Sequence, residues 1–148
     1  MSNGTVATNR RAGQDYFVED AVEAGIVLQG SEVKSMRDHR ASIQEAYAVV
    51  ENGEVWLDNM HIAAYSASLT NPDPYRRRKL LLHKSEIRRL TRAVQQKGYT
   101  CVALALYWKG HRVKCEIALA KGKADHDKRE TIKERDWQRQ KQRLLRHT

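Results

Sequence analysis

The feature that most constrains the fold is a pair of hairpin patterns, each with two β-rich runs around a short turn that contains glycine. In the first, residues 43–51 and 54–62 flank Asn52-Gly53. Asn-Gly is the pair that a two-residue type I′ turn favours, because both turn positions need a positive φ. The turn predicts a cross-strand register, with Val50 opposite Val55, Val49 opposite Trp56 and Ala48 opposite Leu57.

The second hairpin pattern joins residues 99–108 to residues 111–120 through Lys109-Gly110. A two-residue turn at this point predicts one continuous apolar face, because successive side chains alternate between the faces of a sheet. That face holds Leu106, Val113, Leu104, Cys115, Val102, Ile117, Thr100 and Leu119. The opposite face holds Tyr107, Arg112, Ala105, Lys114, Ala103, Glu116, Cys101 and Ala118. The second face is either one that phosphate or ribose approaches closely or an ordinary solvent-exposed face.

The remaining elements complete a small β domain. Residues 15–28 form a long predicted strand, bent at Gly25. The predicted helices are residues 32–38, capped by Ser31, and residues 85–97, capped by Ser85 and ended by Gly98. At least five antiparallel strands with few, short helices favour a mainly β fold: a small antiparallel β-barrel with an OB-like fold and two to three short helices.

The C-terminal residues 121–148 differ from the rest of the chain. Basic residues outnumber acidic ones two to one, and the few apolar residues form no stripe that would face a core. We expect this basic tail to be disordered alone and helical when bound to a polyanion; a solvated tail without a specific function is the alternative. The predicted domains are a flexible lead (1–13), the barrel (14–120) and the tail (121–148).

The overall charge points to a polyanionic partner. The formal net charge is +9, which suits nucleic acid or an anionic membrane. No apolar run approaches the roughly 20 residues that span a bilayer, so nucleic acid is favoured. The N-terminus lacks an apolar signal core, and the two cysteines fit no zinc or disulfide framework. We therefore expect a cytoplasmic protein with reduced thiols and no cofactor or metal.

Two groups of cations need an interpretation. Residues 76–79 are Arg-Arg-Arg-Lys and follow a loop that holds both prolines. Such a run is either a solvated patch or a phosphate-binding site, and the pattern favours neither. The outward-facing cations of the helix over residues 85–97, namely Arg88, Arg89 and Arg92, we interpret as solvated.

The sequence predicts no enzymatic activity. It contains none of the common phosphate-loop, dinucleotide, zinc-protease or serine-hydrolase motifs. His126 lies between Asp125 and Asp127, but a mobile tail does not provide the fixed geometry that acid–base catalysis needs. The alternative of a different class is an RNA-modifying or RNA-cleaving enzyme on a barrel scaffold, which substrate turnover would reveal.

Several short segments follow one another along the chain: NRRA (9–12), EAGIVL (23–28), GSEVKS (30–35), NMHI (59–62), DP (73–74), RKLLL (78–82), the strand from KGYT (97–100) to residue 107, GK (122–123), DKR (127–129) and IKERD (132–136). In this order they together resemble the SsrA-binding protein family, also called small protein B, the bacterial tmRNA-binding factors of trans-translation. The resemblance implies an OB-like barrel that binds the tRNA-like domain of tmRNA and performs no catalysis. Ala64 and Ala124 depart from the family pattern.

Matching positions imply which residues bind RNA. The resemblance places Glu23, Leu81, His83 and Lys114 on the tmRNA surface, with Arg10, Arg11 and Lys34 as neighbours. Arg112, on the same predicted hairpin face as Lys114, and Lys123, in the Gly-Lys pair, complete the expected set. A carboxylate such as that of Glu23 suits this surface because it can accept hydrogen bonds from ribose hydroxyls or base amino groups.

The resemblance also gives the tail a role. It implies that the tail enters the decoding region and empty mRNA channel of the small ribosomal subunit and becomes helical there. The expected ribosome-binding residues are His126, Asp127, Lys128, Arg129, Trp137, Leu144 and Leu145. The implied function is delivery of tmRNA to stalled ribosomes by a monomer bound one-to-one. A general RNA-binding or ribosomal barrel protein with a basic arm is the alternative and would bind tRNA, tmRNA and rRNA alike.

Overall fold

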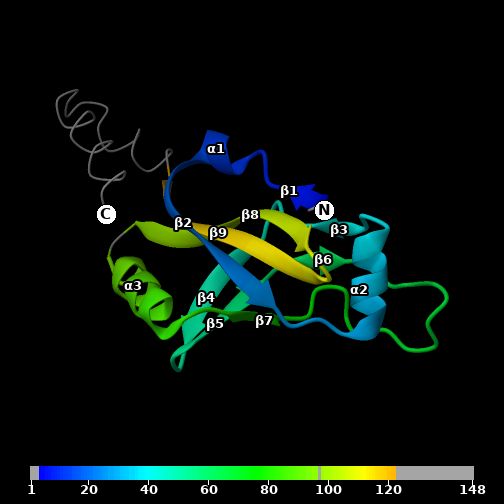
Figure 1. Cartoon of the computed structure of the whole chain (residues 1–148). Coiled ribbons are helices and arrows are strands. Elements are labelled where there is room, and N and C mark those ends of the chain that lie inside the picture. Colours follow the sequence, from blue (N-terminus) through cyan, green and yellow to red (C-terminus); the bar gives the residue numbers. More distant parts are fainter. Residues whose placement is uncertain (1–3, 97, 123–148) are drawn as a thin grey trace.

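The computed structural model of the chain describes residues 4–96 and 98–122 (Figure 1). Within these residues the helices are α1 (Ala12–Asp15), α2 (Gly30–Arg37) and α3 (Lys84–Val94). The strands are β1 (Thr5–Thr8), β2 (Tyr16–Ile26), β3 (Ala41–Ser42), β4 (Tyr47–Glu51), β5 (Glu54–Asp58), β6 (His61–Ile62), β7 (Arg78–Leu81), β8 (Tyr99–Lys109) and β9 (Arg112–Gly122).

The larger sheet closes on itself. Its strands follow the order β1-β8-β4-β5-β7-β2-β9, each antiparallel to the next, and β9 also pairs with β8. Among the described residues, β8, β4, β5, β7, β2 and β9 therefore form a closed ring, and β1 is a further partner of β8. Closure leaves few unpaired strand edges. The predicted mainly β, antiparallel fold class is confirmed, with α2 and α3 at opposite ends of the ring (Figure 1).

The ring is filled by apolar side chains from all of its strands. The core includes Leu57 of β5, Leu80 of β7, Leu106 of β8 and Ile117 of β9, none exposed by more than a few per cent. A smaller cluster of Ala12, Val102 and Ala120 lies under α1, with Tyr16, Val18 and Leu104 packed against it. A fully buried leucine or isoleucine contributes roughly 1.5–3 kcal/mol, so the core is the main source of stability.

The first hairpin has the predicted register. Val50 pairs with Val55, Val49 with Trp56 and Ala48 with Leu57, and both turn residues have positive φ angles, 52° at Asn52 and 76° at Gly53. The prediction that the second strand continues to residue 62 is wrong. Asn59 has a φ of 65°, which turns the chain away from β5, and β6 pairs with β3 in a separate small sheet.

The second hairpin has a different register from the predicted one. Lys109 pairs with Arg112, so the turn is Gly110-His111 and not Lys109-Gly110. A bulge between Ala103 and Ala105 then shifts the pairing by one residue. Because one residue moves a side chain to the other face, Cys101 and Ala103, expected outside, are buried in the core. Val102, expected in that core, packs under α1 instead.

Two features near the N-terminus differ from the expectation. The lead predicted as flexible holds strand β1 and the first residues of α1. The irregularity in β2 lies at Asp20, with a φ of 54° and a register shift between Glu19 and Val22, and not at Gly25.

Both longer helices begin earlier than predicted, after Gln29 and His83 instead of the expected serine caps. In each helix a glutamate three residues after the cap accepts a hydrogen bond from the cap's backbone N–H, at 2.9 Å for Glu32 and 3.0 Å for Glu86. This reciprocal arrangement satisfies donors that a serine side chain two residues later would leave unpaired.

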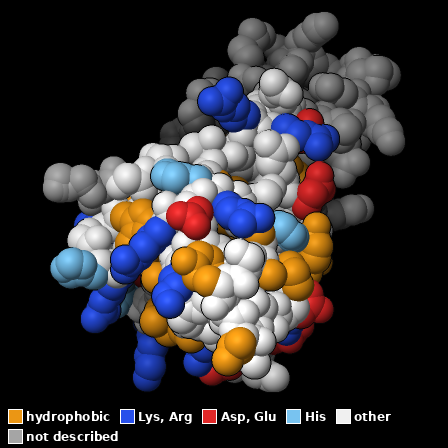
Figure 2. Space-filling view, turned by 90° about the vertical axis from the view of Figure 1, so that its right-hand side faces the viewer, with side chains coloured by type: hydrophobic (Ala, Val, Ile, Leu, Met, Phe, Trp, Pro, Cys, Tyr) orange, Lys and Arg blue, Asp and Glu red, His pale blue; other side chains and the backbone are white. Residues whose placement is uncertain are grey.

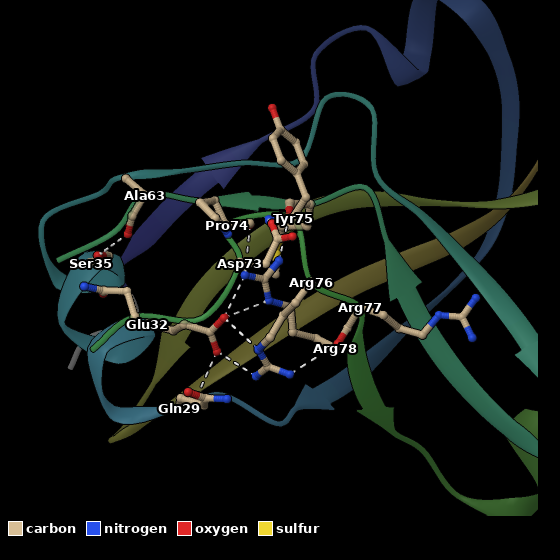
Figure 3. A network of polar contacts seen from close by, with 12 residues as sticks. Gln29, Glu32, Ser35, Ala63, Asp73, Pro74, Tyr75, Arg76, Arg77 and Arg78 are labelled. Carbon is tan, nitrogen blue, oxygen red and sulfur yellow. Dashed lines mark hydrogen bonds and ion pairs between the residues drawn. The ribbon is translucent and has the colours of Figure 1, made fainter. Parts of the chain in front are cut away.

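A buried carboxylate joins α2 to the segment before β7 (Figure 3). Glu32 accepts hydrogen bonds from Arg76, at 2.7 Å and 3.0 Å, and from Arg78, also at 2.7 Å and 3.0 Å. Arg78 is fully buried and donates further to the Met60 carbonyl oxygen at 2.6 Å and the Pro74 carbonyl oxygen at 3.0 Å. Every strong charge in this network is therefore paired, as burial requires.

The cation run at residues 76–79 is ion-paired within the protein. Arg76 and Arg78 bind Glu32, Arg77 bridges Glu51 and Asp58 at 2.6 Å and 2.7 Å, and Lys79 binds Glu54 at 2.8 Å. Each cation has a carboxylate partner within the protein. Arg76 and Arg78 form a structural clamp with the buried Glu32, whereas Arg77 and Lys79 belong to partly exposed ion pairs.

We expect Glu32→Gln to destabilise the protein by about 3–5 kcal/mol, because it leaves the buried Arg78 without an anionic partner. Urea denaturation followed by circular dichroism measures the change in the free energy of unfolding. The control is Glu54→Gln, whose ion pair is 38% exposed at Lys79 and 45% at Glu54. This exposed pair is expected to contribute less than about 1 kcal/mol. Equal effects of the two substitutions would contradict the clamp.

The clamp also predicts a pH dependence. Burial raises the pKa of Glu32, but hydrogen bonds from Arg76, from the Gln29 N–H and from Arg78 outweigh it and hold the pKa below 4.5. A lowered folded-state pKa stabilises the protein above the unfolded-state pKa, and this stabilisation is lost as pH falls through the folded-state value. As pH is lowered below 4.5, the free energy of unfolding should therefore decrease more steeply in the wild type than in Glu32→Gln. Parallel curves would show that folding does not shift the pKa of Glu32.

Candidate nucleic-acid interface

Three strands bring a lysine, a leucine and a carboxylate together around a glycine. Gly25 of β2 pairs with Leu81 of β7 on one side and with Lys114 of β9 on the other. A Cβ at Gly25 would lie 3.4 Å from Leu81 Cβ and 3.8 Å from Lys114 Nζ, so both side chains lean over the glycine. We call the surface formed by Glu23, Gly25, Leu81, Tyr107 and Lys114 the Gly25 surface.

The carboxylate of this surface is held in place by β8. Glu23 accepts a short hydrogen bond from the Tyr107 hydroxyl and one from Lys109 Nζ at 3.2 Å. Tyr107 in turn pairs with Lys114 across the β8–β9 ladder. The Tyr107 hydrogen bond is the largest influence on the pKa of Glu23 and, with Lys109 and Lys114 nearby, holds it below its ordinary value. Glu23 therefore presents an oriented, ionised carboxylate.

A groove of about 520 Å³ adjoins the Gly25 surface. It combines apolar walls with basic residues and is lined by Gly25, Ile26, Val27, Leu28, Val33, Leu81, Trp108, His111, Arg112, Val113 and Lys114. Leu81 is 52% exposed and Val27 is 44% exposed, and because both line this groove they form one exposed apolar patch. An apolar wall beside cations suits a ribose-phosphate chain, which has both apolar and anionic parts.

Helix α2 forms a neighbouring part of the surface. The Arg37 guanidinium lies over the Trp108 ring at 5.5 Å, and Lys34 Nζ lies over the Tyr65 ring at 5.6 Å. On the face that carries α2, Lys and Arg side chains gather along one side with hydrophobic patches between them (Figure 2). This arrangement adds positive charge near the groove without adding a catalytic group.

The predicted RNA-binding residues do not all lie together. Leu81 and Lys114 lie over Gly25, Glu23 lies two residues earlier on β2 near Lys114, and Arg112 lines the adjoining groove. His83 is the N-cap of α3, two residues after Leu81. Arg10 and Arg11 belong to a different region at the start of α1, where Arg11 binds Asp15 at 3.7 Å and Glu45 at 3.4 Å.

Some predicted residues lie outside the described part of the chain. These are Lys123 and the expected ribosome-binding residues His126, Asp127, Lys128, Arg129, Trp137, Leu144 and Leu145.

Three residues were not predicted to belong to the RNA-binding set: Gly25 and Tyr107 of the Gly25 surface, and Lys109, which binds Glu23 beside it. The hairpin pattern did place Tyr107 outward beside Lys114, and this was the available indication. The contact of Tyr107 and Lys109 with Glu23 spans more than 80 residues. A contact of that sequence separation leaves no periodic pattern in a single sequence.

The described residues show little catalytic chemistry. They contain no group of three or more His, Cys, Asp or Glu residues placed to hold a metal ion. Burial raises the pKa of Cys101 to about 12 and raises the pKa of Cys115 further, so both thiols are protonated at neutral pH. In the same residues no helix is long and apolar enough to cross a membrane.

Comparison with known proteins identifies the family. A family model described as SmpB protein matches residues 6–147. The chain is 54% identical over 147 residues to the SsrA-binding protein of Pseudomonas paraeruginosa (strain DSM 24068 / PA7), covering 98% of this chain and 92% of that protein. It is 47% identical over 148 residues to the SsrA-binding protein of Marinomonas sp. (strain MWYL1), covering 99% and 93%. The chain belongs to the SmpB protein family.

A solved structure shows the same fold. A chain of the structure described as "tmRNA-SmpB: a journey to the center of the bacterial ribosome" superimposes with a TM-score of 0.67 at 46% identity. The match covers 78% of this chain and 82% of that chain. The resemblance inferred from short segments is therefore confirmed over nearly the whole sequence and for the fold.

We expect Tyr107→Phe to raise the pKa of Glu23, because it removes the hydrogen bond that most stabilises the ionised carboxylate. Titration of the Glu23 side-chain carboxyl carbon by NMR measures the pKa directly. Lys109→Gln is the comparison; it removes the positive charge beside the carboxylate and should also raise the pKa of Glu23. An unchanged Glu23 pKa in Tyr107→Phe would show that the hydroxyl does not hold the carboxylate.

Proposed function

We propose that the chain binds the tRNA-like domain of tmRNA through the Gly25 surface and delivers tmRNA to stalled ribosomes for trans-translation. The observation that carries this proposal is the approach of Leu81 and Lys114 over Gly25, with the Glu23 carboxylate two residues earlier on β2 and near Lys114. Membership of the SmpB protein family supports the identity of the RNA. A neighbour whose name joins tmRNA, SmpB and the ribosome supports it further.

Each side chain of the Gly25 surface has a distinct chemical role in the proposal. Lys114 binds a backbone phosphate, for which its ammonium group is a mobile point charge. Glu23 accepts hydrogen bonds from a ribose hydroxyl or a base amino group, and its carboxylate rejects a phosphate at that position. Leu81 packs against an apolar sugar or base face. Together these roles select a shape and not merely a charge.

Further residues extend the proposed contact. Arg112 lines the adjoining groove, Lys34 lies next to its wall residue Val33 on α2, and His83 follows Leu81. Arg10 and Arg11 contact a different part of the same RNA or another RNA, since Arg11 is held near Glu45. Lys123 continues the basic character just beyond β9.

The proposal divides the work between the ring and the tail. The ring binds tmRNA, and the tail probes the decoding region and the empty mRNA channel through the residues named above. The protein acts by binding as a monomer, one-to-one with tmRNA, in the cytoplasm, without turnover or a cofactor. Protonated thiols and the lack of a metal-holding cluster in the described residues support a binding role.

We expect Lys114→Ala to weaken binding to the tRNA-like domain about 10- to 100-fold, because a hydrogen bond to a charged group contributes about 1.5–3 kcal/mol. Fluorescence anisotropy at fixed, near-physiological salt measures the affinity for this domain and for an ordinary tRNA. Arg40→Ala removes one positive charge from another exposed position and is the control. A chain ending at Gly122, which keeps all of β9, should retain the preference for the tmRNA domain.

Two outcomes would overturn the proposal. Equal affinity for the two RNAs in the wild type would indicate a general RNA-binding protein. Loss of affinity mainly in the chain ending at Gly122, with Lys114→Ala unaffected, would place recognition in the tail and not on the Gly25 surface.

A further inference from the structure

A second basic surface lies on α3 and shares no residue with the Gly25 surface. Lys84, Arg88 and Arg92 recur at every fourth position of the helix. Residues with this spacing lie on one stripe, about 6 Å apart along the helix axis. The stripe is exposed along its whole length.

The stripe borders a groove between α3 and the first hairpin. The groove has a volume of about 420 Å³ and is lined by Gly53, Lys84, Ile87, Arg88, Thr91 and Arg92. Gly53 is a turn residue between β4 and β5, and a Cβ added there would meet no atom within 4 Å. Ile87 is half-buried and forms an apolar floor. We call this feature the α3 groove.

The charges of the stripe are available for a ligand. Arg89, the neighbour of Arg88 on the helix, binds Asp20 at 2.9 Å. In residues 4–96 and 98–122, by contrast, no carboxylate lies within 4.0 Å of Lys84, Arg88 or Arg92. This contrasts with the run at residues 76–79, where the fold neutralises every cation. Three adjacent cations without a partner repel one another, so an anion that bridges them is stabilising.

The shape of the groove indicates which anion it takes. Evenly spaced cations above an apolar floor match a polymer with regular anionic groups and apolar sugar faces between them. The lining residues include no aromatic side chain, so successive bases have no stacking platform. An acidic peptide would carry its charges on flexible side chains and would need pockets for its apolar residues, which one isoleucine does not provide. Ribose-phosphate is the better match.

We propose that the α3 groove is a second RNA-binding site, which holds the ribose-phosphate backbone of a single RNA strand without reading its sequence. Lys84, Arg88 and Arg92 contact successive phosphates, and Ile87 packs against a ribose. The proposal goes beyond tmRNA recognition at the Gly25 surface, since it assigns a separate contact to a surface at the end of the ring where α3 lies (Figure 1).

The test uses a 12-nucleotide oligouridylate and the full chain. NMR titration should shift the side-chain Nε–Hε resonances of Arg88 and Arg92 saturably and leave that of Arg89 in place. Each single-strand phosphate contact contributes about 0.7 to the slope of log K against log salt concentration. The double variant Arg88→Gln/Arg92→Gln should therefore lower that slope by about 1.4. Arg89→Gln removes a charge from the adjacent position and should leave the slope unchanged.

Several results would overturn the proposal. Unshifted Arg88 and Arg92 resonances would show that the groove binds no RNA, and this measurement on the wild type does not depend on the folding of any variant. An equal slope change in Arg89→Gln would indicate that RNA binding depends on the overall positive charge of the protein and not on the α3 groove. Equal competition by poly-glutamate of the same length would assign the groove to an acidic peptide. The tmRNA preference should survive in the double variant and be lost in Lys114→Ala, so the two proposals fail independently.

Discussion

The structure depends on one buried carboxylate. Glu32 lies on α2 and accepts hydrogen bonds from two guanidinium groups that come from the segment leading into β7. Burying the ionised Glu32 or Arg78 away from water would be strongly destabilising if either charge were unpaired, so each needs the other as its ion-pair partner. If α2 and β7 moved apart, one of these charges would be exposed to solvent or left buried without a partner. This requirement fixes α2 against the ring more specifically than apolar packing alone.

The same clamp positions the proposed interface. Val33, which lines the groove beside the Gly25 surface, follows Glu32 directly, and Leu81 lies three residues after Arg78. Two lining residues of the groove are therefore close in sequence to residues of the buried ion-pair network, which fixes their backbone positions. Glu23 is held in turn by Tyr107, so the acidic as well as the apolar part of the surface is oriented before any ligand arrives. Such preorganisation reduces the ordering cost of binding.

Charge density along the sequence does not locate the available charges. The densest cation run, residues 76–79, is neutralised by carboxylates from α2 and from the first hairpin. Lys114 and the stripe on α3, which form no salt bridge with any residue in the described ranges 4–96 and 98–122, are scattered in the sequence and are gathered only by the fold. A net charge of +9 predicts a polyanionic partner but not where it binds.

The sequence by itself determined the antiparallel β class, the register of the first hairpin and the existence of both longer helices, because turn chemistry and periodicity are local. Collinear short segments also determined the family and, through it, the grouping of Glu23, Leu81 and Lys114. Only the tertiary structure decided the bulge near Leu104, the burial of Cys101 and the partners of Arg76–Lys79. These features depend on ring closure and on ion pairs between residues up to 46 positions apart, and such long-range energies leave no periodic pattern in one sequence.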